Sequence, residues 1–284
     1  MPSARELVNR FSDVKTLPHV AIKVNELVHS ETSDMRDFEK IIKMDPVLVT
    51  RLLRLVNSAY FGLSKKVESI SRAVAYVGMK AVHNLVAVEG IKPFFKEEKE
   101  EQGFSRKDLW LHSATVAILA QMIAVRIFGQ KGDDVFMAGI LHDIGLIVED
   151  QVEGGLLRNA TEAFQKGQKS LISCEDEFVG TNHCLVGTLL TEEWNMSPDV
   201  LDAVSRHHHD IKDEPVSSVI SIVQLAEYFS SRLKYALIPG RVTPLPSPSL
   251  VKHVQAKMAD YRLIARDLPE EMAKAKELYE LDDG

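Results

Sequence analysis

The run Leu141-His142-Asp143-Ile144-Gly145 places a histidine beside an aspartate within a strongly apolar stretch of the chain. Such a stretch is expected to be buried in the folded protein. Imidazole and carboxylate groups are the side chains that divalent metals and general acid and base steps most often use. The run therefore predicts a core segment that carries a site, and any further ligands must come from other parts of the chain.

Helical periodicity dominates on both sides of this run, and few alternating runs bounded by turn residues occur. The chain is therefore predicted to be all-α, a helical bundle of two subdomains with a C-terminal helical tail. Asp45-Pro46 caps one helix, Ser69 or Ser71 begins the next, and Gly78 ends it. The expected helices cover residues 20–28, 33–42, 46–56, 69–78, 80–91, 109–128, 134–143, 162–166, 184–194, 198–206 and 216–235, and a last one opens at Leu268-Pro269.

Two segments divide these helices into three parts. Residues 96–103 form a charge run without an apolar member, and four prolines lie within ten residues between 239 and 248. We therefore expect an N-terminal helical subdomain over residues 1–98 and a second helical subdomain over 99–238. A Pro-rich linker and a helical tail are expected over 239–284.

Composition narrows the class of protein. A hydrophobic content of 45% with 26% charged residues is ordinary for a soluble globular protein, and a net charge of -7 does not indicate a general nucleic-acid binder. The two cysteines form no disulfide framework, and the N-terminus lacks a signal peptide. Polar residues interrupt the apolar stretch 109–128, so it is interpreted as a buried helix and not a membrane span. A soluble cytoplasmic protein is expected.

Further residues of the kinds that bind metals lie on other predicted helices or at their ends. They are His112, His183, the run His207, His208 and His209, and Glu227. A helical bundle gathers a metal site by pointing such side chains inward from facing helices. Each residue also has a simpler interpretation. A histidine in an apolar helix is often a hydrogen-bonded core residue, and Asp143 could be an internal helix cap. The histidine run could provide positive charge that stabilises the negative end of a helix dipole at its C-terminus. Spacing alone leaves metal ligands and core histidines both open.

Longer strings carry a family resemblance. They are residues 45–48 (DPVL), 52–61 (LLRLVNSAYF), 69–74 (SISRAV) and 138–145 (AGILHDIG). Together with His112 and the downstream histidines, they resemble the HD superfamily of metal-dependent phosphohydrolases, and residues 14–212 resemble the HDOD domain of bacterial signalling proteins. The resemblance implies that the second subdomain is HD-like.

The related HD-GYP phosphodiesterases hold two or three metals, and the resemblance carries their ligands to His112, His142, Asp143, His183, His208 and His209. Glu227 stands where those enzymes have a final aspartate. Leu146 stands where they have a lysine, and residues 210–215 replace the GYP motif. These departures imply a metal-binding site that lacks some of the groups those enzymes use for catalysis.

Two functions remain open. The first is a bacterial signal-transduction module without turnover that holds a metal, with Lys65-Lys66 and Arg51 with Arg54 as contact points for an acidic partner. The expected partner is an unidentified signalling protein or a small nucleotide, with no membrane and no nucleic acid involved. The second is a metal-dependent phosphohydrolase acting on nucleotides or cyclic dinucleotides, with Asp143 in the catalytic centre. Iron or manganese, as one or two ions, suits the nitrogen and oxygen ligands.

Overall fold

The computed structural model describes residues 1–12, 23–24, 27, 35–96, 104–167, 169–238 and 243–280. Within these ranges the chain forms helices joined by turns and contains no strand, which confirms the all-α prediction. The helix expected over 20–28 lies outside the described residues except for Lys23, Val24 and Leu27. Most of the charge run at 96–103 and Pro239 also lie outside them.

The chain divides into two compact units. Unit 1 contains Met1–Thr16 and Phe95–Leu268, and unit 2 contains Leu17–Phe94 and Pro269–Gly284. The N-terminal helix α1 (Ala4–Ser12) belongs to unit 1 because its buried face, with Leu7 and Phe11, packs against α9 and α11 of that unit. The predicted three-part division of the chain stays a prediction, since these units group the residues differently.

The first part of unit 2 contains four described helices, two of which have side-chain N-caps. They are α3 (Met35–Ile42), α4 (Pro46–Val56), α5 (Ile70–Val77) and α6 (Met79–Ile91), followed along the chain by the 3-10 helix η1 (Lys92–Phe95). The Asp45 carboxylate accepts a hydrogen bond from the Leu48 amide at 3.0 Å, and Ser69 caps α5 in the same way. Gly78 separates α5 from α6 with φ +93°, a conformation that glycine adopts without steric cost.

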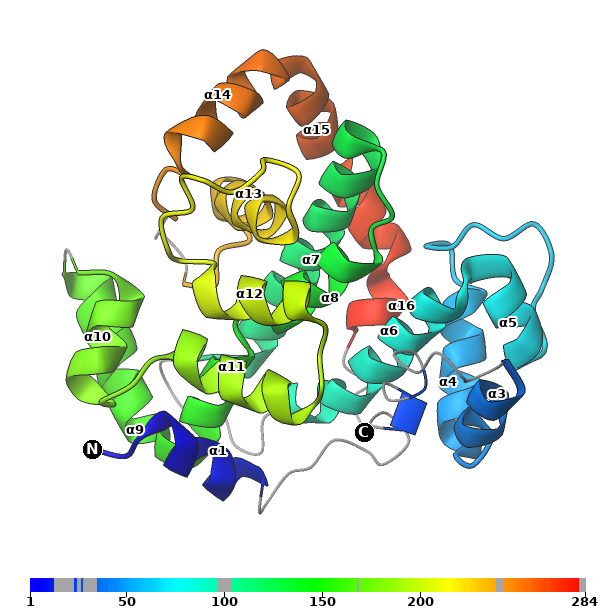
Figure 1. Cartoon of the computed structure of the whole chain (residues 1–284), viewed down its shortest axis with the longest axis horizontal. Coiled ribbons are helices and arrows are strands. Elements are labelled where there is room, and N and C mark those ends of the chain that lie inside the picture. Colours follow the sequence, from blue (N-terminus) through cyan, green and yellow to red (C-terminus); the bar gives the residue numbers. More distant parts are fainter. Residues whose placement is uncertain are drawn as a thin grey trace. The chain divides into compact units, whose positions relative to one another are not determined.

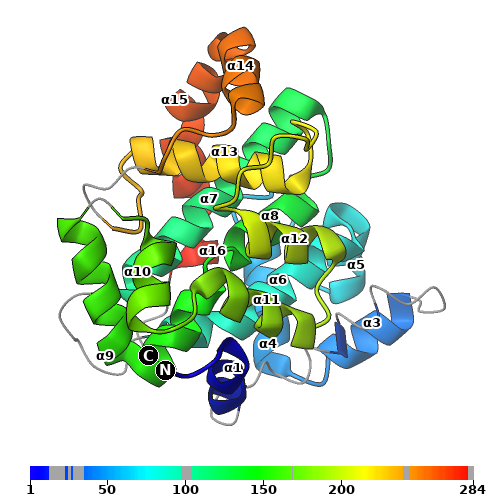
Figure 2. The same cartoon turned by 60° about the vertical axis from the view of Figure 1, so that its left-hand side comes forward.

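Unit 1 holds the remaining helices. They are α7 (Arg106–Phe128), α8 (Asp133–Leu141), α9 (Ile144–Lys166), α10 (Leu171–Phe178), α11 (His183–Glu193), α12 (Pro198–Arg206), α13 (Val219–Arg232), α14 (Pro248–Ala256) and α15 (Met258–Lys274), which ends in unit 2 before α16 (Lys276–Tyr279). α7 packs against α8 and α13, and α9 packs against α10 and α11. α12 contacts α8, α11 and α13, and Figures 1 and 2 show it between α11 and α13. The 141–145 run lies where α8 ends and α9 begins.

The long apolar helix α7 is part of the core. Among the described helices it is the one long and apolar enough to cross a membrane, but 67% of its most apolar window is buried within the fold. Its fully buried residues include Leu109, Trp110 and Leu119. α7 therefore has the burial of a core helix, as the polar residues within it indicated.

Three helix predictions were wrong. The helix expected to run from Asp134 through Asp143 ends at Leu141, because Asp143 (φ -103°, ψ 12°) leaves the helical conformation and α9 begins after it. The helix expected over 162–166 is the last part of α9, and α10 was not anticipated. Pro269 does not open a helix but lies inside α15, where it cannot donate a backbone hydrogen bond.

Candidate metal centre

Seven histidines and carboxylates of unit 1 converge from six different helices or their ends. His112 lies on α7, and Glu227 lies on α13. The His142-Asp143 pair forms the junction between α8 and α9, and His183 is the first residue of α11. All of these side chains are buried, and so is His207, which follows α12, whereas the neighbouring His208 is exposed. Distant parts of the sequence therefore supply one site.

Two glycines allow the helices to approach closely enough to form this site. A Cβ atom on Gly139 of α8 would collide with the backbone of Ala117 on α7. A Cβ atom on Gly145 of α9 would collide with the carbonyl group of His183. Any larger residue at these positions would push the helices apart. The glycine of the 141–145 run is therefore explained by the position of His183.

The first ligand group consists of His112, His142 and Glu227. Glu227 Oε2 lies 2.9 Å from His112 Nε2 and 3.5 Å from His142 Nε2. Asp143 Oδ2 approaches the same group and lies 3.1 Å from His142 Nε2 and 3.6 Å from His112 Nε2. Two imidazole nitrogens thus face two carboxylate oxygens.

The second ligand group consists of Asp143, His183, His207 and His208. Asp143 Oδ1 lies 3.4 Å from His183 Nε2 and 3.3 Å from His207 Nε2. These two nitrogens lie 3.3 Å apart, and the His208 ring contacts the His207 ring with centroids 4.2 Å apart. Asp143 belongs to both groups, one oxygen facing each. Although it occupies the N-cap position of α9, its side chain makes no capping hydrogen bond.

The four buried histidines of the two ligand groups share one hydrogen-bonding pattern. Each ring donates its Nδ1 proton to a nearby acceptor, which leaves the Nε2 atom directed at the ligand groups. The acceptors are the Tyr235 carbonyl for His112 at 2.6 Å, the Gly139 carbonyl for His142 at 2.8 Å, the Glu175 carboxylate for His183 at 2.8 Å and the Val204 carbonyl for His207 at 3.0 Å. Metal-bound histidines are held in this way by their second nitrogen.

The electrostatics of the centre favour positive charge between these side chains. Burial lowers the pKa of His142, but the Asp143 and Glu227 carboxylates outweigh it and raise that pKa to about 10. Burial likewise opposes ionisation of Asp143 and Glu227, yet the histidines hold the pKa of both carboxyls well below its usual value. The centre therefore carries two carboxylates that need a cation close by.

Direct hydrogen bonds do not satisfy the first ligand group. Among the described residues, His112 Nε2, His142 Nε2 and Glu227 Oε2 are buried atoms without a hydrogen-bond partner of adequate geometry. In the second group, the Nε2 atoms of His183 and His207 lie 3.3 Å apart, although each ring already has an acceptor at Nδ1. A divalent cation in each position would satisfy these atoms, so the residues present fit a metal centre with nitrogen and oxygen ligands.

The ligand set predicted from the sequence comes together at six positions. These are His112, His142, Asp143, His183, His208 and Glu227. His209 joins neither group: its side chain is exposed, and its carbonyl accepts a hydrogen bond from Gln224 Nε2 at 2.7 Å. His207 lies where the sequence analysis placed His209. The spacing of Val200, Ala203, Val204 and His207 could have shown this, because it continues the buried face of α12.

Glu175 is a further residue that sequence reasoning missed. Its carboxylate is fully buried on α10 and bonds both His183 Nδ1, at 2.8 Å, and the His183 amide, at 3.4 Å. It contributes to raising the pKa of His183 against the effect of burial. No sequence signal indicated it, because α10 itself was not predicted.

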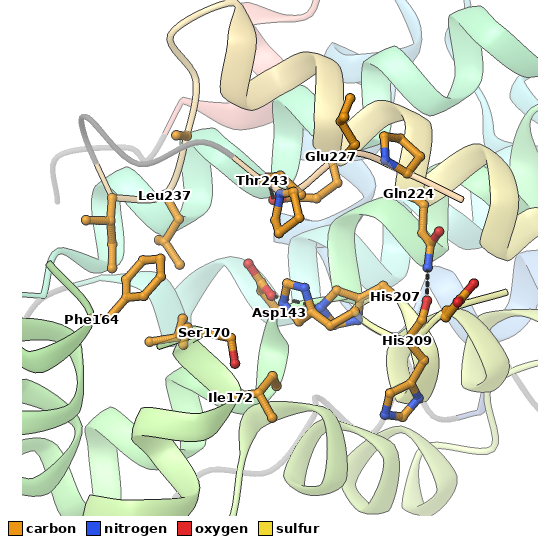
Figure 3. A pocket seen from close by; sticks show the side chains of 18 of the residues that line it. Asp143, Phe164, Ser170, Ile172, His207, His209, Gln224, Glu227, Leu237 and Thr243 are labelled. Atoms are coloured by element: carbon orange, nitrogen blue, oxygen red, sulfur yellow. Dashed lines mark hydrogen bonds and ion pairs between the residues drawn. The ribbon is translucent and has the colours of Figure 1, made fainter. Parts of the chain in front are cut away.

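A cavity of about 980 Å³ opens onto the second ligand group (Figure 3). Asp143, His207, His208 and Glu227 line it, while α9, α10 and the segment before α14 form its walls. Among the described residues that line it, Lys169 is the one lysine or arginine, and it pairs with Glu177 at 2.6 Å. The cavity thus offers metal ligands on one side and mostly apolar walls on the others.

Curated relatives match this chain over part of their length. An uncharacterized protein of Treponema pallidum (strain Nichols) is 25% identical over 244 residues, which is 83% of this chain and 46% of that protein. Ribonuclease Y of Geobacter sulfurreducens is 26% identical over 172 residues, which is 59% of this chain and 27% of that enzyme. The chain therefore spans less than half the length of these relatives.

Solved structures share the fold. An HDOD domain protein of unknown function from Geobacter sulfurreducens has a TM-score of 0.71 at 21% identity, covering 98% of this chain and 96% of that one. A candidate metal-dependent phosphohydrolase from Shewanella amazonensis SB2B has a TM-score of 0.64 at 19% identity, with 98% of both chains covered. Identities this low establish the fold alone.

The HDOD domain model matches residues 14–210, most of the chain and nearly the range that the sequence strings indicated. This range contains His112, the His142-Asp143 junction and the buried His183 and His207. The chain belongs to the HDOD domain family.

Proposed function

We propose that this HDOD domain is a bacterial signal-transduction module that holds two divalent metal ions. One ion would be held by His112, His142, Glu227 and Asp143 Oδ2. The other would be held by Asp143 Oδ1 and the three histidines of the second ligand group. The observation that carries the proposal is the position of Asp143, whose two oxygens face two different sets of buried imidazole nitrogens.

Iron or manganese is the proposed metal. The ligands are neutral imidazole nitrogens and carboxylate oxygens, without a thiolate in either ligand group of the described residues. Such sets suit iron and manganese better than the sulfur-rich sites typical of structural zinc. The second group also lines the cavity, so a small phosphate-bearing ligand could reach its ion.

A regulatory role is favoured over turnover. Leu146, which stands in place of a lysine, is fully buried in the core and supplies no cation to the cavity. Lys169 is the one lysine or arginine among the described residues that line the cavity, and it pairs with Glu177. A transition state with developing negative charge would therefore receive little help beyond that of the metals.

The proposed partner is a cytoplasmic signalling protein with an acidic surface. Lys65 and Lys66 of unit 2 are exposed and remain candidate contacts. Arg51 is a weaker candidate, because it lies 3.6 Å from the buried Glu89 carboxylate.

A metal-dependent phosphohydrolase is the second candidate function, and the cavity next to the second ligand group supports it. Metals bound there would supply Lewis acidity for a phosphate oxygen. The His208 ring, exposed to the cavity, has its pKa lowered well below the usual value by desolvation and by the nearby His207 and His183 rings. It would therefore be neutral, with a ring nitrogen lone pair available to bind a metal. Because ribonuclease Y is similar to part of this chain, RNA is included among the phosphodiesters to be assayed.

Elemental analysis followed by activity assays tests both functions. Protein purified without added metal should contain one to two ions per chain, and His142→Ala should lose them, whereas His253→Ala, outside the centre, should keep them. The loaded protein is then assayed against a cyclic dinucleotide, an RNA oligonucleotide and a generic phosphodiester. Metal without turnover supports the regulatory function, and turnover that His142→Ala abolishes supports the hydrolase. Less than about 0.1 ion per chain contradicts both.

A further inference from the structure

The chain segment before α14 contacts the candidate metal centre at Thr243. Thr243 Oγ1 donates a hydrogen bond to Glu227 Oε1 at 2.9 Å (Figure 3). The other oxygen of that carboxylate, Oε2, faces His112 Nε2 at 2.9 Å. The two oxygens of Glu227 thus have different partners, and the threonine leaves Oε2 available to the first ligand group.

A second contact fixes Thr243 to the same helix. The Thr243 amide donates a hydrogen bond to Ser231 Oγ at 3.2 Å. Ser231 lies four residues after Glu227 on α13, so the two side chains share one face of the helix. Thr243 is therefore held at both its amide and its hydroxyl, which orients the hydroxyl toward Glu227.

The same segment forms a wall of the cavity. Residues 243–248 all line it, opposite Phe164 and Ile172 of the α9 and α10 side (Figure 3). Three of these six residues are prolines, which restrict the backbone, and Leu245 between two of them is 68% exposed. A stiff segment with an exposed apolar side chain thus ends at a hydrogen bond to a candidate metal ligand.

We infer that Thr243 is a positioning residue for Glu227. We further infer that metal binding and the attachment of residues 243–248 to α13 through Thr243 stabilise each other. The inference rests on the proposed metal centre. A hydrogen bond to one carboxylate oxygen restricts rotation of the Glu227 side chain, so less conformational entropy is lost when the other oxygen binds a metal. Because coupling between two equilibria is reciprocal, a bound metal must also hold the segment more firmly.

The coupling gives the domain a way to report its metal state. The metal ligands are buried, whereas Leu245 is exposed on the segment that Thr243 anchors. Loss of the metal would free the Glu227 carboxylate and weaken the anchor of residues 243–248. Gain or loss of the ion inside the centre thereby changes how firmly residues 243–248 are held at the surface.

The test compares Mn²⁺ affinity among four proteins. The free Mn²⁺ signal in electron paramagnetic resonance gives the binding isotherm for wild type, Thr243→Val, Thr243→Ser and Thr50→Val. Valine keeps the shape of threonine but removes the hydroxyl, and serine restores it. Thr50 is the matched control, because its hydroxyl donates to the Pro46 carbonyl in unit 2, whose described residues include none of the candidate ligands. We expect Thr243→Val to bind Mn²⁺ about 10–100-fold more weakly, with the other two variants within about threefold of wild type.

A second measurement needs no variant. Amide exchange of a peptide covering residues 243–250 should slow when Mn²⁺ is added to the wild type. Equal affinity of Thr243→Val and wild type, or exchange unchanged by Mn²⁺, would overturn the coupling while leaving the metal centre intact. A wild type that binds no Mn²⁺ and contains no other metal would overturn the centre itself and the coupling with it.

Discussion

At the scale of single residues, the candidate centre depends on partners that are not ligands. Each buried histidine is held at Nδ1 and therefore presents Nε2 to the centre. Three of the acceptors are backbone carbonyls, which no substitution removes, but the acceptor for His183 is the buried Glu175 carboxylate. Glu175 is therefore the position at which the outer hydrogen bonds of the centre can be tested by mutation.

Glu175→Gln should weaken metal binding by about 10–100-fold, because an amide is a poorer acceptor for His183 Nδ1–H than a carboxylate. Mn²⁺ titration measures this change. Glu177→Gln is the matched control on the same helix, since Glu177 is exposed and pairs with Lys169. Equal affinities in the two variants would show that Glu175 does not support the centre.

Stability should depend on pH differently with and without metal. The carboxylates of the centre, with Cys184 beside His207, outweigh burial and raise the pKa of His142 to about 10 and that of His207 to about 9. Protonation of these histidines stabilises the metal-free fold fully below the unfolded value of 6.5, and the stabilisation is lost as pH rises through the folded-state values. The Tm of chelated protein should therefore fall from about pH 7 to about pH 9.5, and that of metal-loaded protein should fall less. Parallel curves from thermal denaturation would contradict this.

At the scale of helices, the centre depends on two places where backbones nearly touch. Gly139 brings α8 against α7, and Gly145 brings α9 against the start of α11. The first contact places His142 near His112, and the second places Asp143 near His183. Helix packing at these two glycines therefore sets the distances between ligands that are far apart in sequence.

Gly145→Ala should lower the free energy of unfolding by about 1–3 kcal/mol, because the added methyl group collides with the His183 backbone. It should also reduce metal content, since α11 must shift. Gly155→Ala on the same helix is the control: no atom lies within 4 Å of its added methyl, so stability should stay equal or rise by up to about 1 kcal/mol. Chemical denaturation distinguishes the two, and a neutral Gly145→Ala would show that the close approach is not required.

At the scale of the whole molecule, the candidate ligands all belong to unit 1. No residue of either ligand group lies in the described part of unit 2, which is built from α3 to α6 and the residues after Leu268. Unit 2 instead carries the exposed Lys65 and Lys66. The metal centre and the proposed partner surface are therefore assigned to different units.

Removal of the metal should loosen unit 1 selectively. A chelator should increase amide exchange in α8, α11, α12 and α13, which supply or hold the ligands, because metal binding contributes directly to the stability of the folded state. Exchange in α4 and α6 of unit 2 should change little. Mass spectrometry with and without chelator measures both sets of peptides, and a uniform increase in the two units would contradict the assignment.

Local signals predicted much of the fold. The Asp45 and Ser69 caps, the Gly78 break and the apolar period of residues 109–128 all correspond to observed boundaries or buried faces. The prediction failed where tertiary contacts override local preference. Asp143 interrupts a run that is apolar enough to continue as one helix, and Pro269 lies inside α15.

The sequence by itself determined the helical class, the family and the residue types of the centre, because helical period, caps and the 141–145 run are local properties of the chain. Only the tertiary structure decided that His207 and not His209 faces the centre, that Glu175 supports His183, and that Thr243 contacts Glu227. Those contacts join residues on different helices or loops. Their distances depend on how the helices pack at Gly139 and Gly145, which spacing along the chain does not encode.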